Sequence, residues 1–210
     1  MLLNLRFFFI INLVLFSTVA SARTEAIKAG VQYQNLDNEV SGAPVVVEFF
    51  SFYCGPCYLF AETYNVDKTI SGLLPKGVKL TKYHVGVMGE LGEELTVAWS
   101  IAIALGLENQ IEKKLFERQK ANTLKNINDI KAVFSELGIS SEQYDKMKQS
   151  KEIDELINKQ NNAVKAFKVI STPSFYVLGK YKVRNSGIKD KTVEGYSKEF
   201  ADIIVYLLDR

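Results

Sequence analysis

The 210-residue sequence has few of the residues that bind metals or cross-link a chain. It contains two cysteines, Cys54 and Cys57, a single histidine and four prolines. A structural zinc ion takes four ligands, mostly cysteine and histidine, so this composition argues against zinc. The short ring that a Cys54–Cys57 disulfide would close stabilises a fold weakly. We therefore expect no metal and interpret the cysteine pair as a redox site.

The sequence also lacks a surplus of charge of either sign. Its 26 Lys and Arg residues nearly balance 24 Asp and Glu residues, for a formal net charge of +2. No basic cluster, internal repeat or low-complexity segment is present. This composition argues against a nucleic-acid partner.

Only one long apolar run is present, and it lies at the N-terminus. Arg6 precedes an apolar segment, residues 7–19, and Ala20-Ser21-Ala22 forms a small-x-small cleavage site. This layout predicts a signal peptide over residues 1–22, because the run is too short to span a bilayer. An uncleaved anchor is the alternative. Export to the periplasm would place the cysteines where disulfides persist.

The two cysteines stand where a predicted strand passes into a helix. Residues 45–50 are apolar and β-branched or aromatic apart from Glu48, as in a central strand. Pro56 suits the first turn of a helix, which places Cys54 at the N-cap and Cys57 one turn later. The helix terminus favours a thiolate, so we expect Cys54 to be an exposed nucleophile of low pKa. Cys57 is then the more buried resolving thiol.

The remaining sequence predicts an α/β fold that is interrupted by helices. Residues 78–85 alternate as a second core strand and complete a βαβ unit. The next β signal follows about eighty residues later. We therefore divide the mature chain into an α/β domain, residues 23–86 and 169–210, and an inserted all-helical domain, residues 87–168. The other expected elements are an edge strand within residues 30–36, a cysteine helix that runs to about Ser71, a hairpin over residues 174–183 with a type II′ turn at Gly179-Lys180, and a helix over residues 194–208.

Five segments, matched in order along the mature chain, resemble the DsbA family of thiol:disulfide oxidoreductases. They are Glu48–Cys54, Thr81–Val85, Ala98-Trp99, Ala104–Gly106 and Gly179–Tyr181. The resemblance implies a thioredoxin-like fold with an inserted all-helical subdomain and no organic cofactor. It implies that reduced or unfolded exported proteins are the substrates, and that a DsbB-like membrane quinone reductase reoxidises the enzyme. We expect a monomer.

The same resemblance assigns roles outside the cysteine motif. Pro173 would be a cis-proline that faces the cysteines, and Thr172 would offer backbone hydrogen bonds to an extended substrate. Glu48 would relay a proton to or from Cys57, with Lys82 as its partner. Without the resemblance, an ordinary trans turn proline and a solvent-facing acid would be the simpler interpretations.

Other residues near the motif have structural interpretations. We expect His84 to be a hydrogen-bonded structural histidine. We expect Trp99 and the aromatic side chains Tyr53 and Tyr58 to belong to the core more than to a substrate groove.

Four positions at three sites depart from the DsbA pattern. Gly55-Pro56 separates the cysteines, where DsbA typically has Pro-His and thioredoxin has Gly-Pro. Thr172 replaces the common valine, and Ala61 replaces an acid. The lost imidazole removes a cation that would favour the thiolate. A periplasmic reductase or isomerase on the same scaffold is therefore the first alternative, and a non-catalytic chaperone-like peptide binder is the second.

Overall fold

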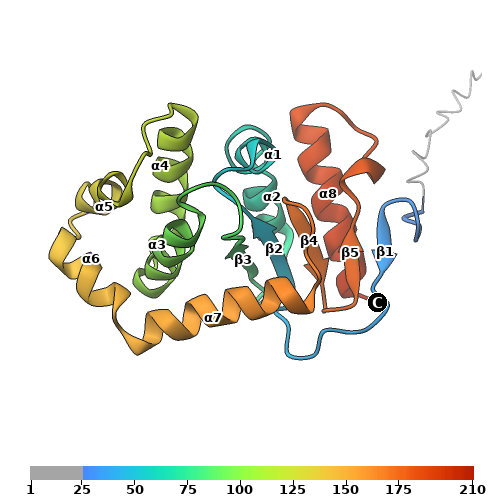
Figure 1. The fold of residues 1–210 in the computed structure, drawn as a ribbon. Coiled ribbons are helices and arrows are strands. Elements are labelled where there is room, and N and C mark those ends of the chain that lie inside the picture. The colour runs from blue at the N-terminus through green and yellow to red at the C-terminus, as the bar shows by residue number, and fades with distance from the viewer. Residues whose placement is uncertain (1–25) are drawn as a thin grey trace, which may run out of the picture.

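The computed structural model describes residues 26–210, so the expected signal peptide lies outside the described residues. The centre of the fold is a five-stranded mixed sheet in the order β1-β5-β4-β2-β3, with helices packed on both faces (Figure 1). Among residues 26–210, no helix is both long and apolar enough to cross a membrane. The strands are β1 (Tyr33–Asn35), β2 (Val46–Phe50), β3 (Leu80–His84), β4 (Ser174–Val177) and β5 (Tyr181–Val183).

Strand β2 lies inside the sheet, parallel to β3 and antiparallel to β4. All five of its residues are buried, as expected for a strand covered on both faces. Val46 packs into the apolar cluster that includes Ile70 and Phe200, whereas Val47 and Phe49 belong to the cluster of the opposite face. Side chains alternate along a strand, so Glu48 lies on the same face as Val46.

Between β3 and β4 the described chain is helical. Helices α3 to α6 form a body beside the sheet, and α7 runs from this body back across the sheet (Figure 1). The body shares one apolar cluster with Phe50 and Phe52 of the sheet region, so the two parts pack as a continuous core. The helices are α1 (Gly55–Tyr58), the π-helix η1 (Leu59–Thr63), α2 (Val66–Leu73), α3 (Gly92–Leu105), α4 (Glu108–Lys120), α5 (Ile127–Ser135), α6 (Ser141–Lys148), α7 (Lys151–Ala166), the 3₁₀ turn η2 (Asn185–Gly187) and α8 (Val193–Leu208).

The structure corrects two details of the sequence interpretation. The cysteine helix is not continuous to Ser71, because it passes into η1 and then breaks at Asn65, whose φ is 50°. In the β4–β5 hairpin, the N–H of Lys180 bonds to the carbonyl oxygen of Val177, so the central turn residues are Leu178 and Gly179. Both have positive φ, which is typical of a type I′ turn and excludes type II′ at Gly179-Lys180.

Candidate active site

The cysteine motif caps a short helix at the end of β2. Cys54 is the N-cap of α1, and Pro56 lies in the first turn, where its missing N–H leaves no hydrogen bond unmade. The backbone N–H of Cys57 donates to the Cys54 sulfur at 3.3 Å. Both cysteines are free thiols, so the structure describes the reduced form.

The segment that precedes β4 lies against this motif. The Thr172–Pro173 peptide bond is cis, and the Cys54 thiol donates to the carbonyl oxygen of Thr172 at 3.2 Å. The Thr172 hydroxyl contacts the Met88 sulfur at 3.7 Å. Strands β2 and β4 are antiparallel neighbours, so the end of β2 and the start of β4 meet, and this brings the two distant segments together.

The two thiols differ in acidity. Hydrogen bonds from Cys57 lower the pKa of Cys54 to about 6, although burial opposes this shift. Burial, the neighbouring Cys54 and the charge of Glu48 raise the pKa of Cys57 far above that of an ordinary thiol. Near neutral pH, Cys54 is therefore the thiolate nucleophile and Cys57 remains protonated.

Exposure of Cys54 is where the sequence interpretation is wrong. We expected an exposed sulfur, but only 6% of the residue is accessible, compared with 1% of Cys57. The Thr172 carbonyl accounts for the difference, because it lies directly against the Cys54 sulfur. Two exposed apolar side chains belong to the segments that meet here: Val87, 89% exposed, precedes Met88, and Ile170, 90% exposed, lies two residues before Thr172.

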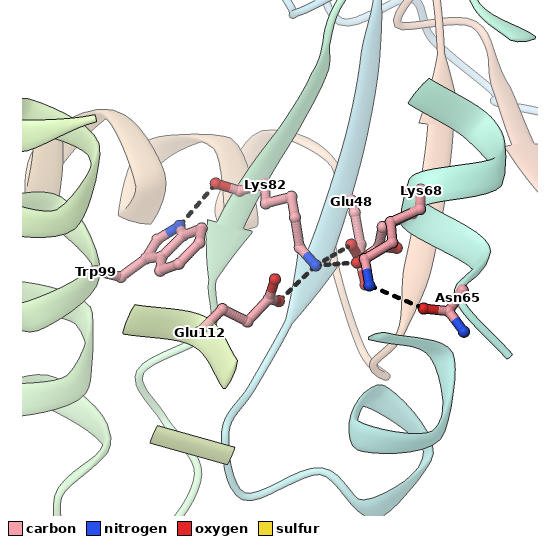
Figure 2. Close-up of polar contacts among 7 residues, drawn as sticks. Glu48, Asn65, Lys68, Lys82, Trp99 and Glu112 are labelled. Carbon is pink, nitrogen blue, oxygen red and sulfur yellow. Dashed lines mark hydrogen bonds and ion pairs between the residues drawn. The ribbon is translucent and has the colours of Figure 1, made fainter. Parts of the chain in front are cut away.

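A buried charged cluster surrounds Lys82 (Figure 2). Glu48 and Lys82 are partners in the β2–β3 register, and the Lys82 ammonium lies 3.0 Å from the Glu48 carboxylate. It also contacts Glu112 of α4 at 2.5 Å and Asp67 of α2. Trp99 donates its indole N–H to the Lys82 carbonyl oxygen at 2.9 Å, which ties α3 to this strand.

Burial is the main perturbation in this cluster. It raises the pKa of Glu48 well above the ordinary value, Asp67 and Glu112 raise it further, and Lys82 opposes them. Burial would lower the pKa of Lys82, but its three carboxylate neighbours outweigh this effect and raise it. Lys82 therefore stays charged, and Glu48 tends to keep its proton.

His84 holds the loop that leads to Cys54. Its Nε2 accepts the backbone N–H of Phe52 at 3.4 Å, and its Nδ1 lies 2.9 Å from the Thr96 hydroxyl, which donates to Gly92. Burial lowers the pKa of His84 to about 3, so the ring is neutral. His84 is thus a hydrogen-bonded structural residue, as predicted, and Trp99 is a core residue, 1% exposed.

Sequence reasoning did not find Asp67 and Glu112. Glu112 lies one helical turn before the buried Phe116 and next to the buried Ile111. A carboxylate within the apolar stripe of α4 was the available signal. It is weak, because such a residue more often lies at the edge of a stripe and reaches solvent.

The chain resembles known proteins over most of its length. A family model described as a DSBA-like thioredoxin domain matches residues 45–193. The thiol:disulfide interchange protein DsbA of Yersinia pestis is 41% identical over 194 residues, which is 92% of this chain and 92% of that protein. The DsbA of Dickeya dadantii is 40% identical over 191 residues, which is 90% of this chain and 92% of that protein.

Solved structures give the same result. The DsbA of Klebsiella pneumoniae superposes with a TM-score of 0.86 at 43% identity, covering 89% of this chain and 100% of that one. A Proteus mirabilis DsbA with a non-covalently bound peptide, PWATCDS, gives 0.84 at 41% identity, covering 88% and 100%. These matches confirm the predicted thioredoxin-like α/β fold, in which helices α3 to α7 are inserted in the sequence between strands β3 and β4. The cysteine pair, its cap and its cis-proline loop thus stand in a chain that belongs to the DsbA family of thiol:disulfide oxidoreductases.

Proposed function

We propose that this protein introduces disulfide bonds into reduced or unfolded exported proteins by exchange through Cys54 and Cys57. One observation carries the proposal: the Cys54 sulfur receives the Cys57 N–H at a helix N-terminus and faces a cis-proline loop. A thiol of low pKa is a good leaving group, so a mixed disulfide at Cys54 breaks readily in favour of the substrate disulfide.

The exchange has two steps. A substrate thiolate attacks Cys54 of the oxidised enzyme, the Cys54–Cys57 bond breaks, and Cys57 leaves as a thiolate that takes up a proton. A second substrate thiolate then attacks the substrate sulfur of the mixed disulfide, and Cys54 leaves as a thiolate. The substrate loses two electrons, and the enzyme disulfide becomes two cysteines.

The other site roles belong to the same proposal. Glu48 exchanges the proton of Cys57, with Lys82 as its charged partner. Gly55 and Pro56 shape the turn between the cysteines, and Thr172 with Pro173 forms the substrate loop. The exposed Val87, next to Met88 in the chain, and Ile170, two residues before Thr172, suit the apolar segments of an unfolded substrate.

The cellular setting follows from the same activity. We propose that residues 1–22 direct export to the periplasm, and that residues 23–86 with 169–210, and residues 87–168, form the two domains of a monomer. A DsbB-like membrane quinone reductase would accept the two electrons and restore the disulfide. The DsbA names of the relatives support this setting.

The direct test is oxidation of a reduced, unfolded protein by the oxidised enzyme, followed by loss of free thiols. We expect stoichiometric disulfide transfer by the wild type and none by Cys54→Ser. A Cys54→Ser variant that still oxidises the test protein would contradict the proposal. So would a wild-type enzyme that binds the unfolded protein without removing its thiols, which is the behaviour of a chaperone-like binder.

A reductase or isomerase is the second candidate, favoured by Gly55-Pro56 and Thr172. A glutathione titration separates the two, because DsbA has a potential of about −120 mV and thioredoxin about −270 mV. The Cys54 pKa of about 6 lies between the values of about 3.5 for DsbA and about 7 for thioredoxin, so it predicts a potential between theirs. A potential close to that of thioredoxin would support the reductase.

A further inference from the structure

The cluster behind Cys57 has more negative than positive groups. Lys82 is the one cation in contact with three carboxylates, Glu48, Asp67 and Glu112, so full ionisation would give +1 − 3 = −2. The side chains are between 1% and 14% exposed. Uncompensated charge at such burial is costly, and a carboxylate in this position tends to keep a proton instead.

The positions of the three carboxylates indicate which of them keeps a proton. Asp67 and Glu112 line a cavity of about 470 Å³ that reaches Lys82, whereas Glu48 is 1% exposed and lies behind it. Glu112 approaches the Lys82 ammonium to 2.5 Å, closer than the 3.0 Å of Glu48. Lys82 hydrogen-bonds to Asp67 and Glu112, whereas Glu48 Oε2, the oxygen that lies 3.0 Å from the ammonium, has this ion pair and no hydrogen bond among the described residues. Glu48 is thus the least hydrated and most weakly paired of the three.

We propose that Glu112, which comes from the helical segment, is a positioning residue that controls proton exchange at Cys57. By pairing with Lys82, it weakens the hold of Lys82 on the Glu48 carboxylate and so favours the protonated form of Glu48. The inference extends the proposed function, because it explains how the thiolate of Cys57 finds its proton. When the Cys54–Cys57 bond breaks, Cys57 leaves with the electron pair and takes the proton of Glu48. Glu48 becomes a carboxylate, and Cys57 becomes a thiol.

The other charges near Glu48 are few. Asp67 approaches it from α2, Lys82 from β3 and Glu112 from α4, and Glu48 acts in turn on Cys57 of α1. Glu62 of η1 acts on Glu112. Removal of the Glu112 charge would therefore free Lys82 to pair with Glu48, and Glu48 would ionise at a lower pH.

The test follows the Glu48 carboxyl by carbon-13 NMR in the oxidised protein, the form that supplies the proton, with Glu48→Gln to assign the signal. We expect Glu112→Gln to lower the Glu48 titration midpoint by at least about one pH unit. The pH profile for attack of a small thiol on the oxidised enzyme should move by the same amount. Glu112→Asp, which restores the charge, should return both toward the wild type.

The matched control is Glu108→Gln, one turn earlier on α4. Glu108 lines the same cavity but has no ion pair with Lys82 among the described residues. This variant should leave the midpoint within about 0.3 pH units of the wild type, a shift too small to reflect a contact with the cluster. An equal shift in Glu108→Gln, or none in Glu112→Gln, would overturn the proposal.

Stability provides the remaining outcomes. Glu112→Gln relieves surplus buried charge, so it should unfold no more easily than the wild type at pH 7. A variant that fails to fold would identify Glu112 as a structural counter-ion of Lys82 and overturn the proposal. Disulfide transfer by the wild type is a separate readout: its failure would refute the proposed function, whereas an unmoved Glu48 midpoint refutes only the role of Glu112.

Discussion

The Thr172 carbonyl oxygen lies 3.2 Å from the Cys54 sulfur, although 118 positions separate the two residues. A thiol can donate a hydrogen bond to this oxygen, but a thiolate cannot. The contact therefore belongs to the protonated form, whereas the Cys57 N–H stabilises the ionised form. Ionisation of Cys54 therefore removes its donor to Thr172 and keeps the Cys57 N–H, which leaves the Thr172 carbonyl free for the substrate N–H that the proposed function requires.

The first prediction concerns the acidity of Cys54. Thiolate absorbance of the reduced protein should show one titration with a midpoint of about 6. Cys57→Ala should raise this midpoint, because it removes the side-chain hydrogen bond that contributes most to the shift. A wild-type midpoint near the ordinary value, about 8.5, would contradict the assignment of Cys54 as the nucleophile.

The same shift predicts a pH dependence of stability. The pKa of Cys54 is lower in the folded state, so its ionisation stabilises the reduced protein fully above about pH 8.5, the pKa of an unfolded thiol. This stabilisation is lost as pH falls toward about 6, by up to ~1.4 kcal/mol per unit. Cys57 does not contribute between these values, since it is a thiol in both states. Urea unfolding of the reduced and oxidised forms should show the difference, which Cys54→Ser removes.

A further prediction separates the roles of the two cysteines. With an oxidised substrate, the Cys54 thiolate of Cys57→Ser attacks the substrate disulfide, forms a mixed disulfide and displaces a substrate thiolate. No Cys57 thiol is then present to attack Cys54 and release the substrate, so mixed disulfides should accumulate. Non-reducing electrophoresis would show them as larger species that a reductant removes. Cys54→Ser should form none. Equal trapping by both variants would mean that Cys57 is also accessible to substrate, against its 1% exposure.

Lys82→Met should destabilise the protein by about 3–5 kcal/mol at neutral pH, because three buried carboxylates lose their cation. The carboxylates would then bind protons more tightly in the folded than in the unfolded state. The loss should therefore be smallest near pH 4.5 and grow as pH rises. Lys159→Met, an exposed lysine beside the same cavity, should change the free energy of unfolding by less than about 0.5 kcal/mol. Equal losses in both variants would contradict this account.

Alanine substitutions at two glycines should change the free energy of unfolding in opposite directions. A Cβ at Gly92, the first residue of α3, would lie 2.1 Å from the backbone oxygen of Gly86, and backbone cannot yield easily. Gly92→Ala should cost about 1–3 kcal/mol as an overpacked contact. Gly72 of α2 has open space around its Cβ position, so Gly72→Ala should stabilise by about 0.5–1 kcal/mol. Thermal unfolding of both variants would check the signs.

The parts of the site that depend on local rules could be predicted from sequence. Pro56 and the apolar strand before it indicated that Cys54 begins a helix, and the structure confirms it. The pairing of Glu48 with Lys82, which the resemblance to the DsbA family implied, is also observed, because β2 and β3 are adjacent strands in register. The helix start is set by a few neighbouring residues, whereas the ion pair depends on the pairing of the strands.

The features that the sequence did not reveal depend on distant contacts. The π-helical turn η1 contains no proline or glycine, and the break at Asn65 has only the modest tolerance of asparagine for positive φ as a signal. The carbonyl group that covers the Cys54 sulfur belongs to Thr172, which lies 118 positions further along the chain. Glu112 reaches Lys82 only because α4 packs against the sheet. The hydrophobic periodicity of one segment does not indicate which distant residues will contact it in the fold.

Cys54 and Thr172 extend from two neighbouring antiparallel strands, β2 and β4, whose register is fixed by Val46–Val177 and the pairs beside it. The gap between sulfur and carbonyl is thus set by the sheet, and the length of chain that joins the strands does not enter into it. Loops between the helices could therefore change in length without altering this gap. The helices themselves are less free to change, because Trp99 and Thr96 of α3 bond to Lys82 and His84, and α3 to α6 share the apolar cluster that contains both cysteines.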